Sequence, residues 1–389
     1  TMAESRSLAA RMDAKRTPVW LDCDPGHDDA FAILLSAHSP SLELIGVSTV
    51  AGNQTVEKTT VNAARILAVA DRYNVPLVQG QARPLIRHQR HDPDIHGHSG
   101  LEGSDHLDAF CPPSVLGVMA EVHGDGIEGN DDLDAFNPPS VVMAEKKGGK
   151  NGEDLWVKRV ATIIGKCNRK VALVATGSLT NVALLLTLCP WVKKNIAQIS
   201  IMGGAIGIGN RSPVAEFNIL VDPEAAQIVF QSNLKVVMVP LEVTHTALAT
   251  KSVMQRVLDL NSPFAKMSVD LLSFFKDTYK RVFDFDSPPV HDPCAVAYVI
   301  NPDIFTVKHL RVDVIYGEHR CAGQTVCDIW KDSSELPPNV HVAVKMDVGK
   351  FWDLMIDALT RCNAVTPFNE FVHSHVARQQ SRPWRRSKL

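Results

Sequence analysis

Four carboxylates stand within eight residues near the start of the chain, in the segment Asp22-Cys23-Asp24-Pro25-Gly26-His27-Asp28-Asp29. A short apolar run over residues 18–22 precedes them and predicts a strand that ends at these side chains. The start of the following helix can attract part of this negative charge, but four carboxylates so close together repel one another. A bound cation would relieve the repulsion, whereas the plainer alternative is a helix N-terminus with surplus acid.

Further polar side chains follow other predicted strands. Asn53 comes after a strand over residues 42–50, Thr176 follows the apolar run 171–175, and residues 210–218 follow a strand over 199–202. Ligands of open α/β sheets bind beyond the carboxyl ends of the strands, so we expect these groups to face one crevice. Carboxylate and carbonyl oxygens without a nearby thiolate cluster favour Ca²⁺ or Mg²⁺ over zinc.

Strands and helices alternate along much of the chain. A helix with Phe31, Leu34, Leu35 and His38 on one side follows the acidic segment. The other predicted helices of this part cover residues 56–71, 179–188 and 223–230, and further strands cover 77–79 and 236–243. Such βαβ units predict a mostly parallel sheet with helices on both faces.

The pattern changes after residue 260. Helices are predicted over 263–283, 294–299 and 351–361, and strands over 310–316, 325–330 and 340–346. No stretch has the composition of a linker between domains. We therefore predict one large α/β domain over residues 17–365, an open, mostly parallel twisted sheet with a Rossmann-like core. An N-terminal extension (1–16) precedes this domain, and a tail (366–389) follows it.

Residues 88–152 interrupt the alternation. They are rich in His, Asp, Gly and Pro and contain a near-duplication, in which residues 99–115 resemble residues 125–141. A structureless loop of this length is unusual in a compact domain, which predicts a functional lid or a partly disordered insertion.

Seven short motifs occur in a fixed order and resemble one known family. They are Asp22-x-Asp24-x-Gly26-x-Asp28-Asp29, Gly52-Asn53-Gln54-Thr55, Thr176-Gly177-x-Leu179-Thr180-Asn181, Met202-Gly203-Gly204, Ala215-Glu216-Phe217-Asn218, Asp222-Pro223-Glu224-Ala225-Ala226 and His291-Asp292-Pro293. The series resembles the nucleoside hydrolases of inosine-uridine type, from about residue 18 to about residue 360 outside the insertion. The resemblance implies an enzyme of nucleoside salvage that hydrolyses the N-glycosidic bond of purine and pyrimidine ribonucleosides to free base and ribose.

The resemblance also implies one Ca²⁺ per subunit and a role for each site residue. The metal ligands would be the carboxylates of Asp24, Asp29 and Asp292 and the main-chain carbonyl of Thr176. The ribose diol would be held by Asp28, Asn53 and Asn218, its 5′ side would face Asn210 and Glu216, and Met202 and Phe217 would line the sugar and base. Asp24 would also be the general base that takes the proton of the attacking water. The water would attack the anomeric carbon in an oxocarbenium-like transition state.

The leaving-group side of the site is less fully specified. His291 would protonate a purine base, because an imidazole titrates near neutral pH, unless it is a structural histidine beside a metal ligand. Tyr279 falls where an aromatic residue of a mobile helix caps the base, unless the helix is simple core packing. Purine-specific relatives sandwich the base between tryptophans, and no tryptophan of this chain falls at those motif positions, which predicts broad base tolerance.

The family's His-Gly-x-x-Gly element, whose histidine reaches the 5′ end of the sugar, has two matches in the insertion. His96-Gly97-His98-Ser99-Gly100 is the better one, and a shorter rival begins at His123. The resemblance therefore predicts that His96 contacts the substrate.

Two other functions stay open at this point. A Mg²⁺-dependent phosphohydrolase with Asp22 as nucleophile and Asp24 as acid explains the acidic segment alone. A catalytically silent nucleoside-binding protein would keep the same residues, with the insertion blocking the mouth of the crevice. Release of phosphate from sugar phosphates would support the first alternative.

Composition narrows the range of partners. The chain has 40 Lys and Arg against 43 Asp and Glu, a formal net charge of −3, which does not fit a generally basic nucleic-acid binder. The most apolar long stretch, residues 171–189, is interrupted by polar residues and predicts no membrane span. Eight cysteines without a CxxC pair predict reduced thiols of an intracellular protein. A homodimer or homotetramer is expected from the resemblance.

The chain ends in Ser387-Lys388-Leu389, the tripeptide that the peroxisomal import receptor binds. Three arginines shortly before it, at positions 382, 385 and 386, make this end of the chain polar. The sequence therefore predicts import into peroxisomes, or into glycosomes in a kinetoplastid, and otherwise a cytoplasmic protein.

Overall fold

An eight-stranded sheet forms the centre of the protein, in the strand order β3-β2-β1-β4-β5-β6-β10-β7. The computed structural model describes residues 16–115, 117–118, 156–317, 320–330 and 335–381. Neighbouring strands run parallel except at the edge, where β7 is antiparallel to β10. The predicted α/β fold with a mostly parallel sheet is therefore confirmed. No helix in the described part of the chain is long and apolar enough to cross a membrane.

The strands of this sheet are β1 (Thr17–Cys23), β2 (Leu42–Thr49), β3 (Leu77–Gln79), β4 (Val171–Ala175), β5 (Ile196–Met202), β6 (Val236–Val239), β7 (Phe305–Leu310) and β10 (Val340–Met346). A separate two-stranded sheet pairs β8 (Val312–Val314) with β9 (Thr325–Cys327). The helices are α2 (His27–His38), α3 (Val56–Val69), α4 (Pro93–His96), α5 (Asp105–Ala109), α7 (Trp156–Lys166), α8 (Thr180–Leu188), α9 (Phe217–Val221), α10 (Pro223–Phe230), α11 (Leu241–Thr244), α12 (Lys251–Leu258), α13 (Pro263–Phe283), α14 (Pro293–Ile300), α15 (Val348–Asn363) and α16 (Phe368–Ser381).

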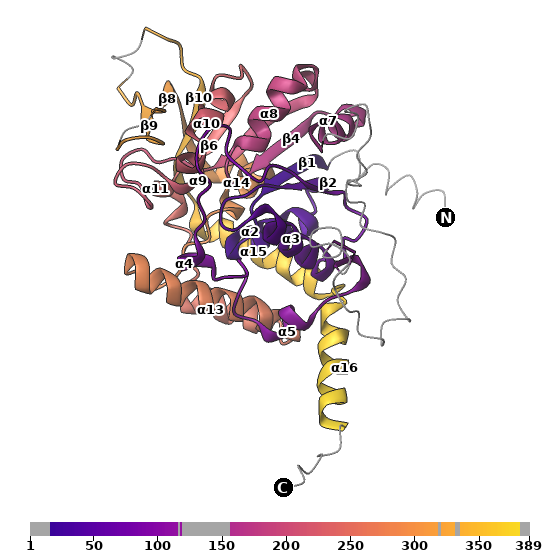
Figure 1. The fold of residues 1–389 in the computed structure, drawn as a ribbon. Coiled ribbons are helices and arrows are strands. Elements are labelled where there is room, and N and C mark those ends of the chain that lie inside the picture. Colours follow the sequence, from indigo (N-terminus) through magenta and orange to yellow (C-terminus); the bar gives the residue numbers. More distant parts are fainter. Residues whose placement is uncertain (1–15, 116, 119–155, 318–319, 331–334, 382–389) are drawn as a thin grey trace.

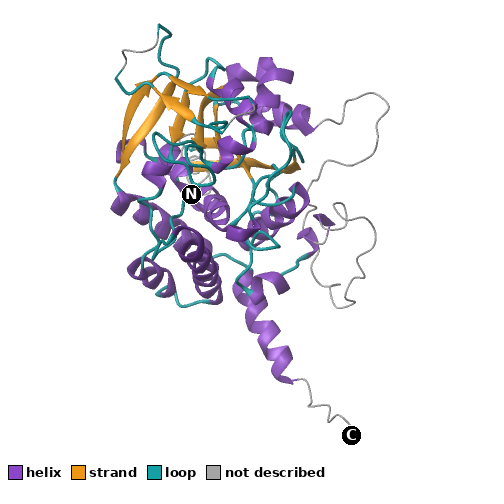
Figure 2. Cartoon of the chain, turned by 60° about the vertical axis from the view of Figure 1, so that its left-hand side comes forward, coloured by secondary structure: helices purple, strands orange, loops and turns teal. Residues whose placement is uncertain are grey.

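Helices cover both faces of the sheet and create two apolar cores (Figures 1 and 2). One core joins the sheet to α2, α3, α14 and α15, and the other joins it to α7, α8 and α10. Successive residues of β1 alternate between the cores, with Val19 and Leu21 in the first and Trp20 in the second. This burial on both faces explains the nearly continuous apolar runs of the central strands.

Several predicted strands differ in their extent, and β5 begins three residues before its predicted start at residue 199. The strand predicted over 236–243 ends at Val239, because Pro240 has no N–H for the ladder and precedes α11. β7 was not predicted, because its edge position leaves it exposed at Thr306, Lys308 and His309 and it lacks an apolar run. The strands predicted over 310–316 and 325–330 shorten to the three-residue strands β8 and β9.

The region predicted as a tail after residue 366 begins with a helix. α16 projects from the body below α15 (Figure 1), and its first residue, Phe368, is fully buried. The ring of Phe368 packs edge-on against Phe110, with 5.2 Å between centroids, and Phe110 also meets Phe371 at 5.1 Å. The start of α16 therefore belongs to the folded body.

Removal of this aromatic anchor is expected to destabilise the protein. Phe368→Ala should lower the free energy of unfolding by about 3 kcal/mol or more, because it deletes a fully buried ring. Urea denaturation measures the loss, and Phe371→Ala, at a half-buried position, is the matched control with a smaller expected effect. Equal and negligible effects of the two substitutions would contradict the anchoring role.

Candidate functional site

Three carboxylates come together beyond the carboxyl ends of the central strands. Asp28 and Asp29 lie in the first turn of α2, directly after β1, and Asp292 lies at the N-cap of α14. One oxygen from each residue lies within 4.8 Å of the others, and all three residues are buried. The helix N-terminus favours this arrangement, because the N–H of Gly26 donates to Oδ2 of Asp29 at 3.0 Å.

Polar groups from neighbouring strands orient the carboxylates. Thr176, just after β4, donates its hydroxyl to Oδ1 of Asp29 at 2.8 Å, and the side-chain amide of Asn53 donates to Oδ2 at 3.1 Å. The main-chain N–H of Asn53 donates to Oδ2 of Asp24 at 2.7 Å. The other oxygen of Asp24, Oδ1, is buried and has no hydrogen-bond partner among the described residues.

The resulting site carries a large excess of buried negative charge. Burial is the main cause that raises the pKa of Asp24, Asp29 and Asp292, and it raises that of Asp28 to about 7. Neighbouring carboxylates raise the pKa values of Asp24, Asp28 and Asp292 further, whereas hydrogen bonds partly offset the effect of burial on Asp29. In the described part of the chain, no Lys or Arg forms an ion pair with any of these four residues. The all-oxygen donor set and the unpaired oxygen of Asp24 fit a hard divalent cation.

The three-carboxylate cluster differs in one member from the predicted metal ligands. Asp28, predicted to face the ribose, belongs to the cluster, whereas Asp24 does not. Asp24 is fully buried and turns one oxygen toward the N–H of Asn53. Sequence order places both carboxylates in the same loop, but it does not indicate which oxygens converge.

A polar cavity lies above the cluster. All nine residues predicted to bind substrate line it: Asp28, Asn53, His96, Met202, Asn210, Glu216, Phe217, Asn218 and Tyr279. Three of the predicted catalytic and metal-binding residues also line it, namely Thr176, His291 and Asp292. Asp24 and Asp29, each with an exposed fraction of 0%, are not among the lining residues. Residues from six segments far apart in the sequence thus converge on one cavity, as the rule for parallel sheets predicts.

One wall of the cavity is organised by Glu216 and Asn218. Glu216 caps α9, accepting the N–H of Asn218 at 2.9 Å and that of Ile219 at 3.2 Å, and burial raises its pKa to about 7. The side-chain amide of Asn218 donates to the carbonyl oxygens of Thr176 at 2.8 Å and Met202 at 3.1 Å. The Thr176 carbonyl, a predicted metal ligand, therefore already accepts one hydrogen bond and keeps one lone pair.

Two further lining residues, Tyr279 and His291, belong to a hydrogen-bonded chain of three side chains. Nε2 of His291 lies 2.7 Å from the hydroxyl of Tyr279, and Nδ1 lies 2.7 Å from the hydroxyl of Thr244. Burial, with a smaller contribution from His245, holds the pKa of His291 well below its usual value. Tyr279 therefore borders the cavity and contacts His291, in addition to its packing against Phe275 in α13.

Several lining residues escaped prediction. Phe275 and Phe283 flank Tyr279 at intervals of four residues on α13, so helical spacing from Tyr279 could have found them. Asp92 lies four residues before His96 and pairs with Arg211 of the β5–α9 loop at 2.9 Å. The rival histidine, His123, and the second copy of the duplication lie outside the described residues.

Residues 19–353 match the family of inosine-uridine preferring nucleoside hydrolases. The chain belongs to this family. A probable ribonucleoside hydrolase of Dictyostelium discoideum is 43% identical over 353 residues, which cover 89% of this chain and 95% of the relative. The pyrimidine-specific ribonucleoside hydrolase RihA of Klebsiella pneumoniae is 37% identical over 344 residues, covering 88% and 98% of the two chains.

A solved nucleoside hydrolase has the same fold. The purine-preferring ribonucleoside hydrolase from Gardnerella vaginalis matches with a TM-score of 0.72 and 27% identity, covering 90% of this chain and all of that one. The sequence prediction of a nucleoside hydrolase is therefore confirmed at the level of family, fold and enzyme class. The phosphohydrolase alternative loses its basis, because it accounted for the acidic segment alone.

Proposed function

We propose that this nucleoside hydrolase cleaves the N-glycosidic bond of both purine and pyrimidine ribonucleosides, with Ca²⁺ in the acidic site, and releases free base and ribose. One observation carries the proposal. The buried carboxylates Asp28, Asp29 and Asp292 converge at a cavity that is lined both by polar side chains and by aromatic rings. A ribose bound at the carboxylates would bring its base within reach of these rings.

The metal would be held by Asp24, Asp29, Asp292 and the carbonyl of Thr176, with Asp28 within reach. Bound Ca²⁺ would make a water more acidic and would attract the hydroxyl oxygens of the ribose. Oδ1 of Asp24 has no hydrogen-bond partner among the described residues, so one of its lone pairs can face the metal and the other can take a proton as general base. The N–H of Asn53 holds the other oxygen of Asp24 and so fixes the direction of this lone pair.

The other polar residues would position the sugar. Asp28, Asn53 and Asn218 would contact the ribose diol, whereas His96, Asn210 and Glu216 would face the 5′ side. Glu216 is held by three main-chain N–H groups, of Gly204, Asn218 and Ile219, and so is a rigid acceptor for a hydroxyl. Rigid groups of this kind reduce the entropy lost when the substrate is oriented.

The leaving base would receive its proton through the Tyr279–His291 pair. The phenol hydroxyl and Nε2 lie 2.7 Å apart, so a protonated His291 would pass its Nε2 proton to the phenol oxygen as Tyr279 delivers its own proton to the base, which leaves a neutral imidazole. Because burial holds the pKa of His291 well below its usual value, this protonated form is a minor one near neutral pH and a strong proton donor. The pKa of Tyr279 is well above its usual value, mainly because of burial and then because of nearby carboxylates, so the phenol keeps its proton until it acts.

Broad base tolerance stays part of the proposal. The cavity offers the aromatic rings of Phe217, Phe275 and Phe283, and stacking on such rings accepts any nucleobase. The similar proteins include both a pyrimidine-specific and a purine-preferring enzyme. Specificity within this family therefore varies on one scaffold.

Free-ribose release by the purified protein tests the proposal. Inosine, guanosine, adenosine, uridine and cytidine should all release ribose, and 2′-deoxyinosine should react at least about 10³-fold more slowly, because its missing hydroxyl leaves metal and carboxylate unpaired. Similar kcat/KM values for inosine and 2′-deoxyinosine would contradict the ribose contacts. Absence of turnover with every riboside, by folded protein supplied with Ca²⁺, would contradict the proposed function and support a silent binding protein.

We also propose that the C-terminal Ser387-Lys388-Leu389 directs import into peroxisomes or glycosomes. α16 projects from the body (Figure 2), which carries the chain away from the enzyme before the last eight residues. A fluorescent protein fused to the N-terminus should be found in peroxisomes, and deletion of the last three residues should disperse it. Import without the tripeptide would contradict this address. The homodimer or homotetramer implied by the resemblance also stays a prediction.

A further inference from the structure

His27 lies inside the acidic segment, yet the proposed mechanism gives it no task. Its side chain is fully buried at the start of α2. The ring is nearly parallel to those of Phe274 and Phe275 on α13, with centroids 5.0 and 5.3 Å away. An apolar ring would satisfy this packing equally well, so the two ring nitrogens require a separate explanation.

Both ring nitrogens of His27 have partners in α4 or in the segment that follows it. Nε2 lies 2.7 Å from the carbonyl oxygen of Glu102. A carbonyl can only accept, so Nε2 carries the hydrogen, and Nδ1 of the neutral ring is left as an acceptor. That Nδ1 lies 3.3 Å from Nδ1 of His96, so the two rings are hydrogen-bonded when Nδ1 of His96 carries the hydrogen. The main-chain N–H of His27 lies 3.3 Å from the same atom and donates to it in the other tautomer of His96.

His96 is therefore held on one side only. Its ring faces His27 and Phe275, with centroids 5.5 and 5.4 Å away, and its Nδ1 is engaged by His27. A Cβ atom at Gly26 would lie 2.3 Å from this Nδ1, so glycine is needed for the close approach. Nε2 has no hydrogen-bond partner among the described residues, and His96 lines the cavity, which leaves Nε2 as the nitrogen for a ligand.

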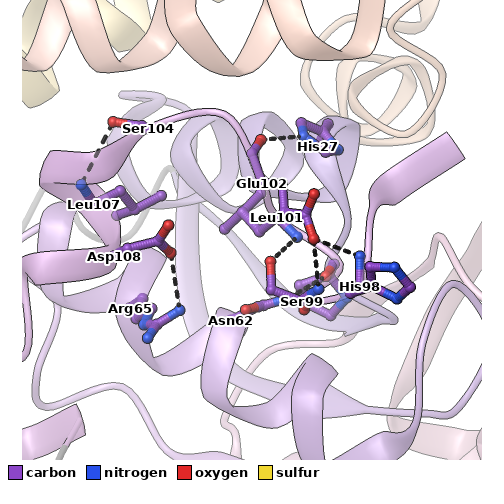
Figure 3. A network of polar contacts seen from close by, with 11 residues as sticks. His27, Asn62, Arg65, His98, Ser99, Leu101, Glu102, Ser104, Leu107 and Asp108 are labelled. Atoms are coloured by element: carbon purple, nitrogen blue, oxygen red, sulfur yellow. Dashed lines mark hydrogen bonds and ion pairs between the residues drawn. The ribbon is translucent and has the colours of Figure 1, made fainter. Parts of the chain in front are cut away.

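The segment after His96 folds into a compact loop that contacts α2 through His27 and α3 through Asn62 (Figure 3). Oε1 of Glu102 accepts the N–H groups of His98 at 2.6 Å and Ser99 at 3.3 Å, and Asn62 of α3 donates to the carbonyl of Ser99 at 3.0 Å. The Glu102 carbonyl points the other way, to His27. His27 thus ties this loop to the helix that carries Asp28 and Asp29.

We propose that His27 is a positioning residue that holds Nδ1 of His96, so that Nε2 of His96 meets the 5′-hydroxyl of the ribose. The inference rests on the proposed function, because it needs a ribose in the cavity. His27 is not among the residues that line the cavity, and it acts only through His96.

A double-mutant cycle with two substrates tests the proposal. His27→Phe keeps an aromatic ring beside Phe274 and Phe275 and keeps the main-chain N–H, but it removes both ring nitrogens. It should raise KM for inosine about 3- to 10-fold, the effect of one lost hydrogen bond, and leave KM for 5′-deoxyinosine within about twofold. His96→Ala should show the same pattern, and the double variant should lose nothing further. If the Phe variant does not fold, the smaller His27→Asn takes its place with the same expected pattern.

His38→Phe is the matched control. His38 is buried in the same helix and its Nε2 lies 2.9 Å from the carbonyl oxygen of Ala70, but it does not line the cavity. This variant should leave KM for both substrates unchanged. Equal losses on inosine and 5′-deoxyinosine, additive effects of His27→Phe and His96→Ala, or equal effects of the two Phe variants would overturn the positioning role.

Imidazole ¹⁵N resonances separate this inference from the proposed function. Those of His96 should shift in His27→Phe and stay in place in His38→Phe, with no substrate present. An inactive wild-type protein would overturn the proposed function. The ¹⁵N resonances would still show whether the side chain of His27 contacts the ring of His96. Unchanged His96 resonances in His27→Phe would overturn the inference even in an active enzyme.

Discussion

Asp24→Asn is expected to lower kcat/KM for inosine and uridine by about 10³-fold or more while the fold persists. The substitution removes the proposed general base and one negative charge from the metal site, and each loss acts on the chemical step. The side chain keeps its volume, and its amide oxygen can still accept the N–H of Asn53. Initial rates of ribose release, together with thermal unfolding, separate lost chemistry from lost structure.

Asp22→Asn is the matched control for this substitution. Asp22 lies two residues earlier and is almost as buried, but its Oδ1 accepts hydrogen bonds from Ser48 and from Asn181. Burial raises its pKa to about 7, so the neutral Asn resembles a form that Asp22 already takes near neutral pH. We expect its activity to stay within about tenfold of wild type. Near-normal turnover by Asp24→Asn would contradict the assignment of the base.

The second large effect is expected at His291, and it should depend on the leaving group. His291→Asn should lower kcat for inosine by about 10²- to 10⁴-fold, because a purine base leaves poorly without a proton. The same variant should hydrolyse 4-nitrophenyl riboside at close to the wild-type rate, because nitrophenolate leaves without protonation. The ratio of the two rates therefore measures the acid role alone.

Neighbouring positions distinguish the parts of this chain of hydrogen bonds. Tyr279→Phe removes the hydroxyl that lies 2.7 Å from Nε2 and should show the same dependence on the leaving group. Thr244→Val removes the contact at Nδ1 and should have a smaller effect, because the proton path to the base is intact. Equal losses on both substrates in His291→Asn would point to a structural role for this histidine.

Much of the fold was predictable because burial on both faces leaves a simple pattern. The runs 171–175 and 77–79 appear as β4 and β3 with their predicted bounds, and the amphipathic repeat over 263–283 appears as α13. The apolar pattern did not predict β7, because this edge strand is partly exposed and lacks an apolar run. It also did not predict the end of β6, where Pro240 cannot donate a hydrogen bond to the sheet. α16 was missed because its residues 373–378 are exposed or half-buried, so the helix shows no continuous apolar stripe.

The site residues could be collected from the sequence, but their contacts could not. The residues predicted to bind substrate all line one cavity, since strand ends of a parallel sheet share an edge. Which carboxylate joins Asp29 and Asp292 in the cluster depends on the geometry of the turn before α2. No local sequence pattern predicts that geometry. The pairing of Tyr279 with His291 and that of His27 with His96 join elements far apart in the chain, which no local pattern predicts.

The most direct test of the account is the rate of ribose release from inosine by metal-stripped protein as Ca²⁺ is added back. We expect no turnover after chelation. When Ca²⁺ is added back, the rate of ribose release should rise and saturate at one Ca²⁺ per chain. Asp292→Asn should need much more Ca²⁺ for the same response, because it removes one carboxylate of the cluster. A full rate in excess chelator, with stripped protein shown to hold no metal, would contradict the metal site on which the account depends.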